Sequence, residues 1–166
     1  MKTLSQKSIL AIFVMLLTLV PTPAATLGTK RTLTLEIARG IVAAVEKKAT
    51  ENKWAMVVAV LDDGGNLLQL ERMDEAPIGS VQVAQQKART SVIFKSPTKD
   101  FADGLAKGTT ALMKLDIIPF AGGIPIVVNG QVIGAIGVSG GATDTQDANA
   151  AQAGADWFNS NFNSKK

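Results

Sequence analysis

The sequence predicts a single α+β domain in which helices cover a mostly antiparallel sheet. The apolar periodicity gives the element order α-β-β-α-α-β-β-β-α. Short turns rather than helices join most of the predicted strands, which is typical of antiparallel hairpins. The chain has 166 residues, the length of one domain, and contains no repeat and no interdomain linker.

The first 25 residues differ from the rest of the chain. Lys2 and Lys7 precede an apolar run over 9–20, and small residues follow it. This pattern is typical of a secretory signal peptide, and the run is shorter than the ~20 apolar residues of a membrane span. We expect cleavage at about 24–25, which leaves 26–166 as one domain. An N-terminal core helix or an uncleaved anchor is the alternative.

Charge and cysteine content restrict the partners and the compartment. Removing two lysines leaves 15 basic and 14 acidic residues, a net charge of +1, so we expect no nucleic-acid partner. The chain has no cysteine and therefore tolerates an oxidising compartment. A periplasmic or secreted location is expected, with no membrane span after signal removal.

The first predicted helix runs from the capping residue Thr34 to about Lys53. An apolar strand over 54–61 and a second strand over 67–73 follow, joined by a turn over 62–66. The two aspartates in this turn could bind a hard cation, but we interpret them as turn residues that bond their own backbone. The buried stripe of the helix consists of Ala38, Ile41, Val42, Val45 and Ala49.

Two helices and a poorly defined segment follow. Ser80 begins a helix with an apolar inner face, and Ser96–Pro97 resembles an N-cap followed by proline at the first helical position. The second helix is expected to end near Lys107, and 108–116 is either loop or broken helix. The inner face of the first helix consists of Val81, Ala84, Ala88 and Val92.

Three strands and a final helix complete the prediction. We expect strands at about 117–121, 124–128 and 131–139, with Asn129–Gly130 forming a type I′ turn between the last two. The last helix is expected over about 144–162. Its capping box consists of Thr143 and Gln146.

The chain lacks histidine, cysteine and tyrosine. Their absence excludes a Ser-His-Asp triad, a thiol nucleophile, an ordinary zinc centre and covalent c-type haem. Polar chemistry is left to carboxylates, hydroxyls, basic side chains and the backbone. We therefore assign no catalytic residue, and an enzymatic activity is not favoured.

Two glycine pairs, two basic residues and one methionine remain as candidates. Gly122–Gly123 and Gly140–Gly141 could form ligand-facing nests or could only permit tight turns, and neither matches a nucleotide-binding fingerprint. Lys87 and Arg89 lie two apart on a helix, so at most one faces a given pocket, and a solvated face is the default. Met113 lies in the unplaced segment.

Five motifs indicate a known family. They are VVAVLDDGGNLLQLERMD (57–74), QQKARTS (85–91), SPT (96–98), FAGGIPI (120–126) and GQVIGAIGVSGG (130–141). In this order they resemble the GlcG/HbpS family, which includes the C-terminal domain of PduO-type proteins. The resemblance implies a profilin-like three-layer α/β/α sandwich with a five-stranded antiparallel sheet, and homo-oligomers from dimers to octamers. It also implies binding of haem b.

Relatives that bind haem coordinate iron through histidine or, in secreted members similar to HbpS, through a threonine. Because this chain has no histidine, the resemblance implies the second type. Thr98 of the SPT motif is the matching metal ligand. Thr109, Thr110 and Met113 are reserve candidates.

The resemblance also suggests residues for the rest of the haem. Lys87 and Arg89 match the basic helix motif and are candidates to pair with the propionates. Phe94, Phe101 and Phe120 could line the macrocycle. A neutral hydroxyl is a weak iron ligand, so the affinity would come mainly from apolar burial at roughly 25 cal/mol per Å².

Three functions are therefore considered. The first is an exported haem-binding protein that scavenges haem or assists iron or redox sensing. The second is an enzyme for a hydroxy acid or a cofactor, with Lys87, Arg89 and Gly122–Gly123 holding a carboxylate. The third is a ligand-free accessory subunit of a periplasmic dehydrogenase complex. In each case the apolar hairpin over 124–138 predicts cover by a second copy.

Overall fold

The computed structural model describes residues 25–163. The chain divides into two compact units, 1–30 and 31–166, and every described helix and strand belongs to the second. The predicted signal peptide falls almost entirely on residues 1–24, outside the described part. No helix within 25–163 has the length and apolar character needed to cross a membrane.

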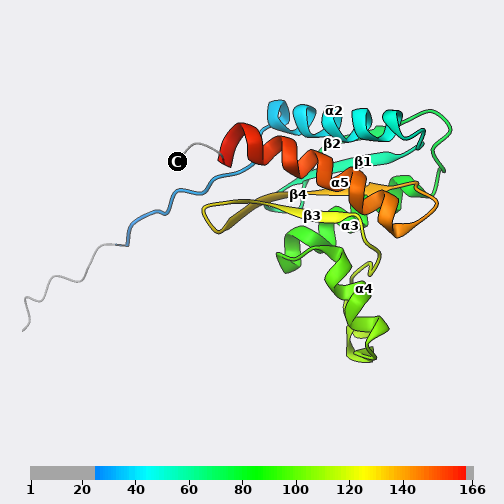
Figure 1. The fold of residues 1–166 in the computed structure, drawn as a ribbon. Helices are drawn as coiled ribbons and strands as arrows, with labels where there is room; N and C mark the ends of the chain where they lie inside the picture. Colours follow the sequence, from blue (N-terminus) through cyan, green and yellow to red (C-terminus); the bar gives the residue numbers. More distant parts are fainter. Residues whose placement is uncertain (1–24, 164–166) are drawn as a thin grey trace, which may run out of the picture. The chain divides into compact units, whose positions relative to one another are not determined.

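The described strands form one four-stranded antiparallel sheet in the order β2-β1-β4-β3 (Figure 1). The predicted fifth strand at 117–121 is absent. Pro119 has no N–H to donate to a ladder, and the Ile118 N–H donates to Thr90 Oγ1 at 3.1 Å instead. The strands are β1 (Val57–Asp62), β2 (Leu67–Arg72), β3 (Gly123–Val128) and β4 (Gln131–Ser139).

Strand β1 is buried on both faces, which accounts for its continuous apolar sequence. Val58 and Val60 belong to one apolar cluster and Val57, Ala59 and Leu61 to another, on the opposite face of the sheet. The sheet is therefore the middle layer of three, as expected from the family resemblance.

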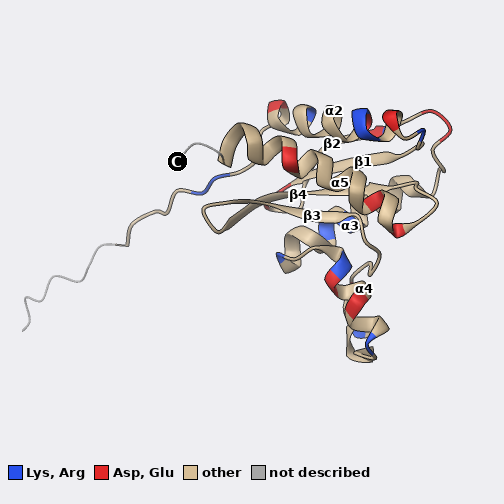
Figure 2. Cartoon of the chain, viewed as in Figure 1, with Lys and Arg blue, Asp and Glu red and all other residues tan. Residues whose placement is uncertain are grey.

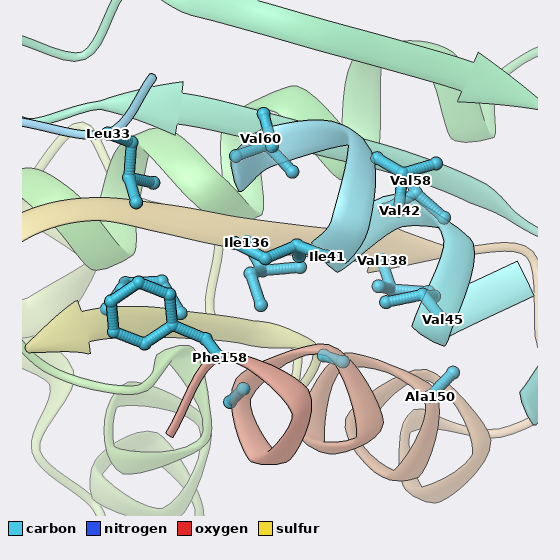
Figure 3. Close-up of a cluster of buried hydrophobic side chains, with 14 of the residues drawn as sticks. Leu33, Ile41, Val42, Val45, Val58, Val60, Ile136, Val138, Ala150 and Phe158 are labelled. Carbon is cyan, nitrogen blue, oxygen red and sulfur yellow. The ribbon is translucent and has the colours of Figure 1, made fainter. Parts of the chain in front are cut away.

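Helices α2 (Leu35–Glu51) and α5 (Asp144–Phe158) cover one face of the sheet (Figure 1). Figure 3 shows the core beneath them, where side chains from both helices meet those of β1 and β4. The predicted caps are confirmed: Thr34 Oγ1 accepts from the Ile37 N–H, and Thr143 Oγ1 accepts from the Gln146 N–H. The last helix ends earlier than predicted, and its final turn widens into a π-helix, η2 (Asn159–Asn163).

Helix α3 (Ser80–Phe94) packs on the other face, and its buried Ala84, Ala88 and Val92 confirm the predicted inner side. Helix α4 (Thr98–Ala106) and a 3₁₀ helix, η1 (Thr110–Lys114), follow and extend away from the sheet (Figure 1). Pro97 is the N-cap of α4 rather than its first helical residue.

The β3–β4 hairpin has the predicted turn. Asn129 and Gly130 both have positive φ, 50° and 77°, as a type I′ turn requires. The β1–β2 turn also follows the prediction, because Asp62 Oδ1 accepts from the N–H groups of Gly64 and Asn66 at 2.9 and 2.8 Å.

Candidate functional site

A buried ion pair lies between α3 and α5. Lys87 Nζ is 2.6 Å from Asp147 Oδ2, and the two residues are 1% and 5% exposed. Asp147 Oδ1 also accepts from the Gly141 N–H at 2.8 Å. Neighbouring strands β3 and β4 carry no charged residue (Figure 2). The pair therefore satisfies two charges inside a largely apolar region and ties a glycine loop to both helices.

Gly122 and Gly123 allow the backbone to approach this pair closely. Gly122 has φ +120°, and a Cβ there would lie 2.6 Å from Val138 O and 3.1 Å from Lys87 Nζ. A Cβ on Gly123 would lie 2.5 Å from both Lys87 O and Thr98 Cγ2. These glycines are required by packing, so the structure favours the tight-turn interpretation for this pair.

Burial raises the pKa of Asp147, while the Lys87 ammonium and the Gly141 N–H oppose that rise. The Lys87 ammonium is paired with Asp147 and is buried, so it is not available at the surface. The default expectation of a solvated Lys87 is therefore wrong. Its partner Asp147 was not identified from the sequence, because nothing in the spacing of two residues sixty positions apart predicts their contact.

Thr98 begins α4 and is completely buried. Its Oγ1 accepts from the Gly123 N–H at 2.8 Å, which joins the start of α4 to the start of β3. An iron ligand must reach the ligand-binding surface, and this hydroxyl has no exposed area. In the conformation described, Thr98 fits a structural role better than a metal-binding one.

The reserve candidates are all exposed. Thr109 and Thr110 lie at the start of η1, and Met113 within it is 76% exposed. Phe120, just before β3, is also exposed. Five exposed apolar residues in this part of the chain form what we call the exposed apolar set: Ile93, Phe94, Met113, Leu115 and Phe120.

The aromatic side chains predicted to line a ligand are partly brought together. The rings of Phe94 and Phe101 meet edge to face with centroids 5.4 Å apart, which connects the end of α3 to α4. Exposed large apolar side chains commonly mark a binding surface when they form a patch. The exposed apolar set lies within residues 93–120, between the end of α3 and the start of β3, and we call this segment the apolar candidate site.

Arg89 points away from Lys87, as their spacing predicts. It is exposed and lines two cavities, one of about 290 Å³ and one of about 300 Å³. Asp116 lines the first of these cavities as well. Sequence reasoning missed Asp116 because it lies in the segment that periodicity left unplaced. Within residues 25–163, no group of three or more acidic side chains could hold a metal ion.

Residues 33–156 match the family model HbpS-like, described as haem degrading protein HbpS-like. The chain belongs to the HbpS-like family. The match spans the four strands described within 25–163 and most of the described helices, so the resemblance found in the sequence motifs is confirmed.

Known proteins are similar to this chain in sequence, in structure or in both. Protein GlcG of Escherichia coli K12 is 41% identical over 112 residues, which are 67% of this chain and 84% of GlcG. A double mutant of Streptomyces reticuli HbpS is 33% identical with a TM-score of 0.72, over 82% of this chain and 97% of that structure. A PduOC:haem complex is 26% identical with a TM-score of 0.69, over 77% and 96% of the two chains.

Proposed function

We propose that this HbpS-like protein binds haem b at the apolar candidate site. Two observations on related proteins support the proposal: the description of the family as haem-degrading and the haem complex of PduOC, which has the same fold. The observation on this chain that carries it is the exposed apolar set, since apolar side chains in water gain most from covering an apolar macrocycle.

Among the candidate ligands, η1 offers the accessible donor atoms. Thr109 and Thr110 provide hydroxyl oxygens and Met113 provides a thioether sulfur, all exposed. Arg89 is the remaining candidate for a propionate, because Lys87 is paired with Asp147. The role of the chain's residues is to bind and orient haem, and iron would supply any redox chemistry.

An open face covers only one side of a flat ligand. We therefore propose that a second copy of the chain covers the other side and that the protein is a homo-oligomer. With weak neutral donors, apolar burial at roughly 25 cal/mol per Å² would provide most of the affinity. The expected binding is modest and reversible.

Haemin titration of the purified protein tests this site. We expect a saturable shift of the Soret band that is weakened at least tenfold by Phe94→Ala combined with Met113→Ala, while Ile78→Ala leaves it unchanged. Ile78 is a suitable control because it is 83% exposed and lies before α3. The absence of any saturable shift would contradict the proposal.

Two threonine variants distinguish the ligands. Thr109→Val with Thr110→Val should change the spectrum of the bound haem if η1 supplies an oxygen ligand, whereas Thr98→Val should leave it intact. A spectrum that changes with Thr98→Val and recovers with Thr98→Ser would instead assign the buried hydroxyl as ligand.

We also propose that the chain is exported with residues 1–25 as a signal peptide. The supporting feature is the basic start followed by an apolar run in the sequence. The mass of the protein isolated from its host should correspond to a chain that begins at about residue 26. A full-length mass in the extracted protein would contradict export by cleavage.

A further inference from the structure

We propose that Arg89 and Asp116 form a two-point site for a small carboxylate that also carries a hydrogen-bond donor, such as a hydroxyl or an ammonium group. This site shares Arg89 with the proposed haem site and differs from it in its second point, Asp116. It rests on three features of the structure: an arginine without a partner, an acidic group in the same cavity, and a buried hydroxyl that holds the cavity wall in place.

Arg89 has no partner among residues 25–163. It forms no hydrogen bond and no ion pair with any of these residues. Its Nη1 lies over the β1–β2 turn, 3.6 Å from where a Cβ on Gly65 would be. A planar guanidinium without a partner is suited to hold a carboxylate through two parallel hydrogen bonds.

Asp116 gives the same cavity a second, opposite charge. It lies between η1 and β3 and lines the cavity of about 290 Å³ together with Arg89. The two side chains are not paired with each other. A ligand that bridges them needs a carboxylate at one end and a donor at the other, which a hydroxy acid or an amino acid provides.

A hydrogen bond also joins two of the residues that line this cavity. Thr90 is 3% exposed and lines the cavity, and its Oγ1 accepts from the Ile118 N–H at 3.1 Å. This bond ties the segment that carries Asp116 to the helix that carries Arg89. The hydrogen bond therefore restricts the position of the backbone two residues after Asp116 relative to α3.

The second cavity suggests where the rest of the ligand lies. It has a volume of about 300 Å³, shares Gln86 and Arg89 with the first, and adds Leu61 and Leu67 from the β1–β2 hairpin. Both volumes are at the lower end of those of ligand pockets, roughly 300–1,000 Å³. The ligand is therefore small, and a short apolar group on it would contact the two leucines.

This geometry replaces the carboxylate site expected from the sequence. Lys87 and Gly122–Gly123 are buried around the ion pair with Asp147, so they cannot contact such a ligand from the surface. A haem propionate would satisfy Arg89 but would bring no donor to Asp116. The preferred ligand thus differs from haem in a way that can be tested.

Calorimetric titration with three compounds that share a three-carbon skeleton provides the test. Lactate carries a hydroxyl, alanine carries an ammonium group, and propionate carries neither. We expect lactate or alanine to bind at least tenfold more tightly than propionate, and the better of the two identifies the donor. Equal affinities for all three, or no saturable heat with any of them, would overturn the proposal.

Substitutions then assign the two points. Arg89→Gln should abolish binding of the preferred compound, while Arg39→Gln, an exposed arginine on α2, should not change it. Asp116→Asn should remove the preference over propionate. Thermal melting verifies that each variant is folded. Retained binding in folded Arg89→Gln, or a retained preference in Asp116→Asn, would refute the site, whatever the outcome of haemin titration.

Discussion

The ammonium of Lys87 lies 2.6 Å from the carboxylate of Asp147, sixty residues later in the chain. This contact joins the middle of α3 to the first turn of α5, at the point where both glycine loops pass. Its two charges are almost fully buried, so each depends on the other to offset the loss of hydration.

Lys87→Met should lower the free energy of unfolding by about 3–5 kcal/mol, because it leaves the Asp147 carboxylate buried without its counter-ion. Urea unfolding at pH 7 measures the change. The exposed pair Lys99–Asp103, also separated by 2.6 Å, is the control, and Lys99→Met should cost no more than about 0.5 kcal/mol. Similar losses in both variants would show that burial does not make the difference.

Thr98→Val should destabilise the protein by about 1–3 kcal/mol, because the buried Gly123 N–H loses its acceptor while the side-chain shape is preserved. Hydrogen exchange at the Gly123 amide should accelerate in this variant. Thr98→Ser keeps the oxygen and should retain the protection. If Gly123 exchanges as slowly in Thr98→Val as in the original protein, the hydrogen bond at 2.8 Å does not determine its protection.

Gly130→Ala should cost about 1–2 kcal/mol, because its φ of +77° lies in the left-handed region. Space is not the cause, since a Cβ there would have no neighbour within 4 Å. Gly79 has equally open surroundings but a right-handed helical backbone, with φ −61°. Gly79→Ala should therefore be neutral or stabilising by up to about 1 kcal/mol. Equal effects in thermal melts would contradict the conformational explanation.

Glu46→Gln should stabilise the protein at neutral pH. Burial on α2, and then the nearby Glu71 carboxylate, raise the pKa of Glu46 above its usual value of 4.5. A raised pKa in the folded state means that the charged form opposes folding, so the gain appears as pH rises through that pKa and vanishes below the unfolded value. For this partly exposed group we expect at most about 0.5 kcal/mol.

Thermal melting at pH 7 and at pH 3.5 checks the sign. The difference between Glu46→Gln and the original protein should be positive at pH 7 and close to zero at pH 3.5. Glu71 contributes to the shift of the Glu46 pKa. In a protein that already carries Glu71→Gln, adding Glu46→Gln should therefore stabilise the fold by less than it does in the original protein. A larger gain in stability at pH 3.5 than at pH 7 would contradict a raised pKa of Glu46.

Features that depend on a few neighbouring residues were predictable from the sequence. The caps at Thr34 and Thr143, the type I′ turn at Asn129–Gly130 and the buried stripe of α2 all agree with the structure. Each results from local hydrogen bonds, from backbone torsion preferences or from a helical period of 3.6 residues. Such forces act within one turn or one element.

Tertiary contacts decided the rest. A fifth strand was expected, but Thr90 takes the N–H of Ile118, which lies 28 positions away. Lys87 has the sequence environment of a solvated helix residue, yet Asp147 and the glycine loops enclose it. Local patterns alone predict which segments become helices and strands. Which polar groups meet depends on how distant segments pack, because burial and pairing of charges are determined only when those segments come together.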